Sequence, residues 1–205
     1  MQALIIVDVQ YDFLPGGALA VRDGDKVIPV INSIQPKFDL IVATQDWHPA
    51  DHGSFAANHP GTHPGEVIKL SGVDQVLWPV HCVQGSEGAG FHRDLDQSRW
   101  TKVFQKGTNR MVDSYSGFYD NNRMGDTGLA GFLKQERVNE VFVVGLATDY
   151  CVKFTVIDAL LEGFDTWVVV DATKGVNLSE QDSLLAIDEM IQAGAQVIES
   201  RSVSQ

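Results

Sequence analysis

The chain has 205 residues, of which 44% are hydrophobic and 20% are charged, and this is enough apolar material for one α/β domain with a full core. Its formal net charge of -12 at pH 7 argues against nucleic acid or an anionic membrane surface as a partner. The apolar run behind Met1 lacks a preceding basic region, so we expect no secretory signal peptide, and no later segment has the uninterrupted apolar length of a membrane span. We therefore predict a cytoplasmic protein with two reduced cysteines.

Short apolar runs alternate with helical patterns along the chain. Residues 3–7 (ALIIV) form a continuous apolar run, which is typical of a strand covered on both faces. Further strands are predicted over 40–44, 102–105, 140–144, 166–170 and 196–199. Helices are predicted over 25–35, from 126 or 127 to 136, from 151 to about 162 with Gly163 just beyond it, and from a capping-box sequence at 179–182 to 193.

This alternation implies right-handed βαβ crossovers. The prediction is one α/β domain over residues 1–205, with a doubly wound, mostly parallel six-stranded sheet and helices on both faces. The segment from about 45 to 100 interrupts the pattern, because it loses hydrophobic period and gathers Gly, Pro, His and Asp. Loops of this length are usually functional or disordered, and Phe55, Trp78 and Phe91 favour an ordered, functional one.

Chemically active side chains follow the predicted strands at the point where each strand ends. Because ligands bind beyond the carboxyl ends of parallel strands, these side chains are expected at one edge of the sheet. They are Asp8 after the first strand, Asp46 and His48 after the second, Lys106 after the third, Cys151 after the fourth and Asp171 after the fifth.

Cys151 is the candidate nucleophile. It is expected in the first turn of a helix, where unpaired N–H groups and the helix dipole favour a thiolate, and the N–H groups near Ala147 and Cys151 could hold an oxyanion. Asp8 can accept the thiol proton and return it to a leaving amine, while Lys106 lets both negative groups exist at neutral pH. Each residue alone has a structural alternative: a small buried thiol, a carboxylate that caps a turn, or a solvated lysine. Their common location favours the active site.

A second group of residues has the chemistry of metal ligands. Asp46 and His48 lie two residues apart on extended chain, so their side chains point to the same side, and His81 ends the long loop. A mixed Asp/His set suits Zn, Fe or Mn with water completing the shell, and His52 is a candidate further ligand. Surface histidines are the alternative, and they are the better explanation of His59, His63 and His92. Cys82 is a rival nucleophile or ligand, although a buried structural thiol is the simpler interpretation.

Five motifs together resemble the isochorismatase-like cysteine hydrolases, and the match spans nearly the whole chain in order. The motifs are residues 7–13 (VDVQYDF), 46–49 (DWHP), 78–82 (WPVHC), 106–107 (KG) and 145–151 (GLATDYC). Within that family they are most similar to the motifs of nicotinamidases, also called pyrazinamidases. The resemblance implies a catalytic triad of Asp8, Lys106 and Cys151. It also implies a metal that binds the pyridine nitrogen of the substrate and is held by Asp46, His48 and His81.

The resemblance carries further expectations for the pocket. Phe13, Trp78 and Tyr115 are expected to wall a flat ring. The peptide bond between Leu146 and Ala147 is expected to be cis. One divalent ion is expected, with Zn first and Fe or Mn as alternatives.

The activity implied by the resemblance is hydrolysis of nicotinamide to nicotinate and ammonia through a cysteine thioester, in NAD salvage, with pyrazinamide as a further substrate. Three alternatives stay open. They are a related amidase that acts on another small amide such as a carbamoyl compound, a hydrolase in which metal-bound water attacks directly, and a binding module without catalysis. A homo-oligomer also stays open, because many folds of this kind associate, although no segment exposes an obvious partner face.

Overall fold

A computed structural model describes residues 1–204 and has a six-stranded sheet at its centre. The strand order is β5-β2-β1-β6-β7-β8, and every neighbouring pair is parallel. The strands are β1 (Gln2–Val7), β2 (Leu40–Asp46), β5 (Lys102–Lys106), β6 (Glu140–Leu146), β7 (Asp165–Lys174) and β8 (Gln196–Ile198). The helices are α1 (Val27–Ile34), α2 (Leu129–Gln135), α3 (Lys153–Leu161) and α4 (Asp182–Ala193). The predicted doubly wound parallel sheet is confirmed. Among the described helices, none is long and apolar enough to cross a membrane.

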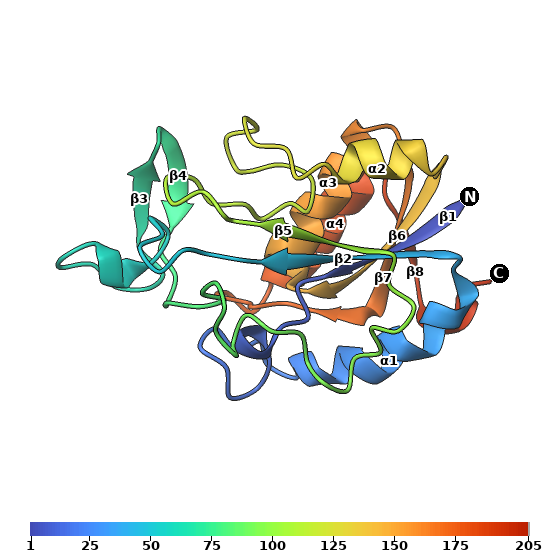
Figure 1. Ribbon diagram of the computed structural model, residues 1–205, viewed down its shortest axis with the longest axis horizontal. Coiled ribbons are helices and arrows are strands. Elements are labelled where there is room, and N and C mark those ends of the chain that lie inside the picture. The colour runs from blue at the N-terminus through green and yellow to red at the C-terminus, as the bar shows by residue number, and fades with distance from the viewer. Residues whose placement is uncertain (205) are drawn as a thin grey trace.

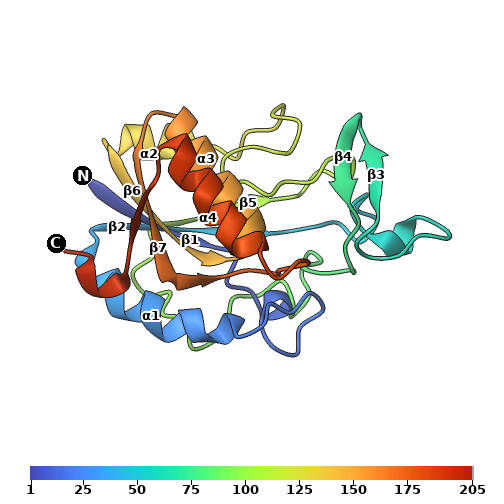
Figure 2. The ribbon, with the colours of Figure 1, turned by 180° about the vertical axis from the view of Figure 1, so that it is seen from behind.

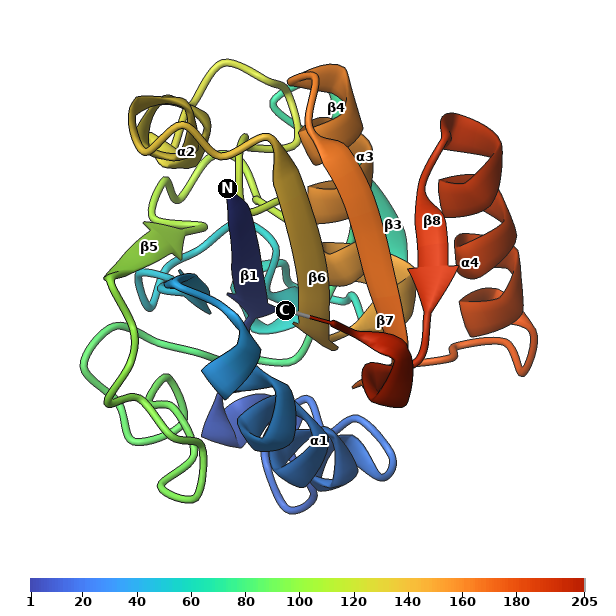
Figure 3. The same ribbon diagram turned by 90° about the vertical axis from the view of Figure 1, so that its right-hand side faces the viewer.

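Helices cover both faces of the sheet, with α1 on one side and α2, α3 and α4 on the other (Figure 3). The alternation of side chains along β1 produces these two layers. Leu4 and Ile6 belong to the apolar cluster that contains α1, whereas Ala3, Ile5 and Val7 belong to the cluster that contains the other three helices. All five side chains are buried, which explains why this strand is continuously apolar in the sequence.

Several element boundaries differ from the prediction. β2 and β5 each extend far enough to include the polar residue expected just beyond them, Asp46 and Lys106 respectively. The predicted capping box before α4 forms in one direction only: the Ser179 N–H donates to Asp182 Oδ2 at 2.7 Å, and no side chain caps the helix. Gly163 does follow α3, with a positive φ of 88°.

The segment between β2 and β5 contains an antiparallel hairpin that the sequence analysis did not predict. Its strands are β3 (Val67–Leu70) and β4 (Val73–Val76). Figures 1 and 2 show the hairpin at the end of the molecule toward which the parallel strands point, while both termini lie at the opposite end. Gln75 of β4 is buried, and its Nε2 donates to Asp113 Oδ2 at 3.0 Å and to Tyr115 Oη at 3.1 Å. The hairpin is thereby attached to the edge of the sheet where the candidate site lies.

Candidate active site

The carboxyl ends of β1, β5 and β6 bring Asp8, Lys106 and Cys151 together. The Lys106 ammonium is buried, and its Nζ lies 2.9 Å from Asp8 Oδ2 and 3.4 Å from Cys151 Sγ. It also donates to the Ser114 carbonyl at 2.8 Å and pairs with Asp46 Oδ1. Successive strands are added outward in opposite directions from β1 and β6, so the switch point of the sheet lies between these two strands. Ligands bind at this point of a doubly wound sheet.

The charges of this cluster depend on one another. Burial alone would lower the pKa of Lys106, but the carboxylates of Asp46 and Asp8 raise it well above its ordinary value, so the amine is an ammonium. Burial raises the pKa of Asp8, and the ammonium offsets part of this rise. Asp8 Oδ1 accepts the Thr44 hydroxyl at 2.6 Å, whereas Oδ2 accepts no hydrogen bond from the described residues and has only the ion pair with Lys106. That oxygen can therefore take a proton.

Cys151 lies in a π-helical turn, Thr148–Val152, that leads into α3. The turn closes when the Val152 N–H donates to the Ala147 carbonyl at 3.1 Å, so the nucleophile precedes the α-helix and does not begin it as predicted. Burial raises the pKa of Cys151 well above its ordinary value, although Lys106 opposes the rise, so burial favours the thiol where the helix terminus was expected to favour the thiolate.

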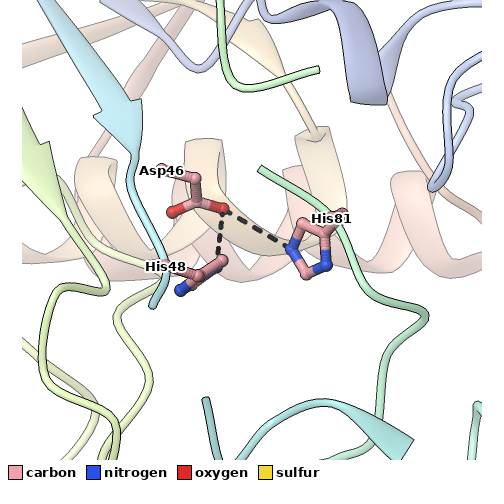
Figure 4. Close-up of side chains that lie close together, drawn as sticks. All are labelled: Asp46, His48 and His81. Carbon is pink, nitrogen blue, oxygen red and sulfur yellow. Dashed lines mark ion pairs between the residues drawn. The ribbon is translucent and has the colours of Figure 1, made fainter. Parts of the chain in front are cut away.

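Asp46, His48 and His81 form a buried group of three potential metal ligands, with one donor atom from each within 4.8 Å of the others. Figure 4 shows both imidazoles beside one oxygen of Asp46; its Oδ2 lies 3.5 Å from His48 Nε2 and 3.8 Å from His81 Nε2. His48 Nδ1 is bonded to the Gly107 carbonyl at 2.9 Å, and His81 Nδ1 to the Pro79 carbonyl at 2.8 Å. Since a carbonyl only accepts, each Nδ1 carries a proton and each Nε2 is left to bind a metal.

Two further observations support this group as a metal site. His48 Nε2 is buried and has no hydrogen-bond partner among the described residues. Burial lowers the pKa of His81 to about 4, so its imidazole is neutral at neutral pH, as a ligand must be. Gly107 makes the close approach of His48 feasible, because a Cβ there would lie 2.3 Å from the ring carbon Cε1.

His52 differs from the other two histidines of the cluster. Its ring centroid lies 4.4 Å from that of His48, but its Nδ1 lies 3.1 Å from the Ser54 backbone nitrogen. A backbone N–H only donates, so Nδ1 accepts, and in the neutral imidazole Nε2 carries the proton. Burial lowers the pKa of His52, which keeps the ring neutral. His52 therefore presents a donor N–H where His48 and His81 present a lone pair.

Aromatic side chains surround the cavity above Cys151, as expected for a flat substrate. Its lining includes the three predicted ring-wall residues, Phe13, Trp78 and Tyr115. It also includes four residues that the sequence analysis missed: Leu19, Asp113, Tyr150 and Val176. Tyr150 directly precedes the nucleophile, and its ring packs edge-on against Trp78 with centroids 4.9 Å apart. This position beside Cys151 was the signal that could have identified it.

Asp113 is the most distinctive of the missed residues. It is a buried carboxylate, and one of its oxygens lies within 4.8 Å of donor atoms of His48 and His52. Its oxygens accept the Ser114 N–H at 2.8 Å and Gln75 Nε2 at 3.0 Å. The sequence placed it in an irregular stretch without strand-end context, so no pattern marked it.

The side chains of two further candidates do not join this cluster. Asp171 was predicted at the same edge, but β7 continues past it to Lys174, and its exposed carboxylate accepts the Ser200 N–H and hydroxyl at 2.8 and 2.6 Å. Cys82 is buried in the apolar layer that contains α1, and its backbone N–H donates to Asp12 Oδ2 at 2.7 Å. Its surroundings are those of a structural thiol.

Comparison with known proteins agrees with this geometry. Residues 2–202 match the family model described as the isochorismatase domain. The chain belongs to the isochorismatase family. The peptide bond between Leu146 and Ala147 is cis, as the resemblance to this family implied.

Several members of the isochorismatase family are closely similar to this chain. A nicotinamidase of Escherichia coli (strain K12) is 50% identical over 198 residues, which cover 95% of this chain and 92% of the relative. The structure of an Acinetobacter baumanii nicotinamidase and pyrazinamidase matches with a TM-score of 0.95 and 47% identity, covering 98% of this chain and 96% of the other. The structure of a Pyrococcus horikoshii pyrazinamidase in complex with zinc matches with a TM-score of 0.77 and 39% identity, covering 97% and 98% of the two chains.

Proposed function

We propose that this member of the isochorismatase family hydrolyses nicotinamide to nicotinate and ammonia, a reaction of NAD salvage, and that it also deamidates pyrazinamide. The observation that carries the proposal is the meeting of an acid, an ammonium and a thiol beside an Asp/His donor set, in a cavity with aromatic walls. The names of the similar Escherichia coli and Acinetobacter proteins support the same substrate.

In the first half of the reaction, Cys151 Sγ attacks the carboxamide carbon. Because burial keeps the sulfur protonated at rest, Asp8 accepts the thiol proton as the bond forms. Lys106 stays protonated and stabilises the negative charge that develops on the sulfur 3.4 Å away. When the C–N bond breaks, Asp8 gives its proton to the departing nitrogen, ammonia leaves, and a thioester remains on Cys151.

The second half returns the enzyme to its starting state. A water molecule gives a proton to Asp8 as its oxygen attacks the thioester carbon. The C–S bond breaks, Asp8 returns the proton to the sulfur, and the product leaves as the carboxylic acid, which ionises to nicotinate by losing its proton to water. In both halves we assign the oxyanion to the backbone N–H groups of Ala147 and Cys151, since both residues line the cavity.

The donor set fits a divalent metal, because His48 and His81 have the correct tautomer and His48 Nε2 lacks another partner among the described residues. We propose that Asp46, His48 and His81 hold zinc, with Fe or Mn as alternatives, and the zinc complex of the Pyrococcus relative supports this choice. When bound, the ion supplies a Lewis acid for the ring nitrogen of the substrate. We leave His52 outside this set, because its Nε2 carries the proton of the neutral ring; this nitrogen has no hydrogen-bond partner among the described residues.

We also propose that residues 45–100 form a functional loop of a single domain. The segment supplies His48 and His81 to the donor set and Trp78 to the cavity wall. Both cysteines are free thiols, which supports action in the reducing cytoplasm.

The test is ammonia release from nicotinamide, pyrazinamide and benzamide by the metal-analysed protein. Benzamide has the ring and the carboxamide but no ring nitrogen, so its kcat/KM is expected to be lower by about 100-fold or more. Absence of ammonia from nicotinamide would refute the proposed activity. Equal turnover of benzamide would refute recognition of the ring nitrogen. Alkylation of the thiols is expected to abolish turnover. Turnover that survives alkylation would favour direct attack on the carboxamide by metal-bound water.

A further inference from the structure

The carboxylate of Asp149 connects two segments that both line the cavity. Asp149 belongs to the π-helical turn that carries the nucleophile, and it is buried. Its Oδ1 accepts the Val176 N–H at 2.9 Å, and its Oδ2 accepts the Asn177 N–H at 2.7 Å. Both oxygens are thus used on two consecutive amides of the segment that follows β7. Bonds of this kind to a charged acceptor are stronger than bonds between neutral groups.

The two segments differ in how firmly they are held. Thr148, Cys151 and Val152 of the turn are buried, so the turn is fixed by the core. In the other segment, Val176 lines the cavity, but residues 177–181 that follow it are exposed. If the bonds to Asp149 are lost, the exposed segment is the part that moves. Cys151 then stays in place while Val176 leaves the wall.

The segment has a second attachment that does not involve the cavity. Asn177 Oδ1 accepts the backbone N–H and the hydroxyl of Ser183, at 2.9 and 2.7 Å. Gly175 fits closely between the two attachments, because a Cβ there would lie 2.0 Å from Ser183 Oγ and 3.1 Å from Asp149 Oδ1. The position of Val176 is therefore set from both directions.

We propose that Asp149 is a positioning residue that fixes segment 175–177 against the nucleophile turn, and so holds Val176 as one wall of the substrate pocket. The proposal rests on the proposed amidase function for its kinetic consequences. The attachment itself is a property of the fold and can be measured without any substrate.

The decisive variant is Asp149→Asn. It keeps the size of the side chain but replaces one acceptor oxygen by an NH₂ group that faces a backbone N–H. We expect KM for nicotinamide to rise about tenfold, the size of effect for one lost bond to a charged acceptor, with kcat changed by less than about threefold. Val176→Ala is expected to raise KM by less. In the double variant the two effects on KM should not multiply, because Asp149 acts through Val176.

Asp182→Asn is the matched control. Asp182 also accepts a backbone N–H of this region, that of Ser179 at 2.7 Å, and the substitution changes the net charge by the same amount, but Asp182 does not line the cavity. It should leave KM unchanged. Hydrogen exchange should show faster exchange at residues 176 and 177 in Asp149→Asn and not in Asp182→Asn. Gly175→Ala displaces the same segment while Asp149 is intact, so it should also raise KM. This variant replaces Asp149→Asn in the test if Asp149→Asn does not fold.

Three results would overturn the proposal: unchanged exchange at residues 176 and 177, a fall in kcat with KM unchanged, or multiplying effects in the double variant. If the wild-type protein releases no ammonia from nicotinamide, the proposed function fails. The exchange experiment still decides whether Asp149 holds the segment.

Discussion

Cys151 and Cys82 are both buried thiols, and they lie on opposite faces of the sheet. Burial raises the pKa of each well above its ordinary value. Cys151 has the Lys106 ammonium 3.4 Å from its sulfur and lines the cavity, whereas Cys82 packs among the apolar side chains around α1. The hydrogen bond between Cys82 and Asp12 uses the backbone N–H of Cys82 and not its thiol. Burial alone does not separate a reactive thiol from a structural one. The neighbouring ammonium and the access to a cavity do.

The largest expected effect comes from removing the reactive thiol. Cys151→Ala should lower kcat for ammonia release by about 10⁴-fold or more, because no other group can form the thioester. Metal content should stay at the wild-type level, since the sulfur is not in the Asp46, His48 and His81 group. Elemental analysis of the same sample provides the control. Substantial turnover by this variant would mean that the covalent step does not occur at Cys151.

Removing the ammonium tests what distinguishes the two thiols. Lys106→Met should lower kcat by about 10³-fold and reduce the free energy of unfolding by about 3–5 kcal/mol, because it leaves buried carboxylates without a counter-charge. Denaturant unfolding measures the second effect.

The double variant Lys106→Met/Asp8→Asn is the matched control. It removes one of the stranded carboxylates, so part of the stability should return while the activity does not. Wild-type stability in the single variant would show that the ion pairs of Lys106 do not hold the site together.

The metal group adjoins both regions, because Asp46 pairs with Lys106 and His81 directly precedes Cys82, and it offers a second comparison, between His48 and His52. His48→Ala should abolish stoichiometric zinc binding, whereas His52→Ala should weaken zinc affinity by only about tenfold, as expected for a residue that does not itself bind the ion. Competition with a chelator measures both affinities. Equal losses in the two variants would make His52 a ligand and contradict its assigned tautomer.

The smallest effect is expected at the structural thiol. Cys82→Ala should keep kcat within about threefold of wild type and lower the free energy of unfolding by about 1 kcal/mol, because a small buried side chain is shortened by one atom. Thermal unfolding and ammonia release together check this. A loss of activity comparable to that of Cys151→Ala would remove the distinction between the two regions.

The sequence predicted the sheet and the residues at its edge well, because both depend on local patterns. A buried strand is continuously apolar, and Asp8 and Lys106 appear where such runs stop. Asp171 was predicted at the end of its strand, but β7 continues past it to Lys174 and Asp171 is an exposed residue within the strand. A hydrophobic pattern does not reveal such a continuation. The hairpin was missed because β3 and β4 are short and half-exposed, although Ser71 and Gly72 between them have the positive φ values of a two-residue turn.

Contacts made by long-range folding left no signal in the sequence. Asp149 stands in the recognised motif two residues before Cys151, but nothing local indicates that it binds the amides of Val176 and Asn177. The tautomer of His52 depends on a local contact, the N–H of Ser54 two residues along the chain, but only the folded geometry shows which ring nitrogen accepts it.

If nicotinamide passes through a thioester on Cys151, acid quenching during steady-state turnover traps it, and peptide mass spectrometry detects it. We expect a nicotinoyl group on the peptide that contains Cys151 and none on the peptide that contains Cys82. Rapid ammonia release with no adduct on Cys151 at any quench time, or an adduct on Cys82 instead, would contradict this expectation.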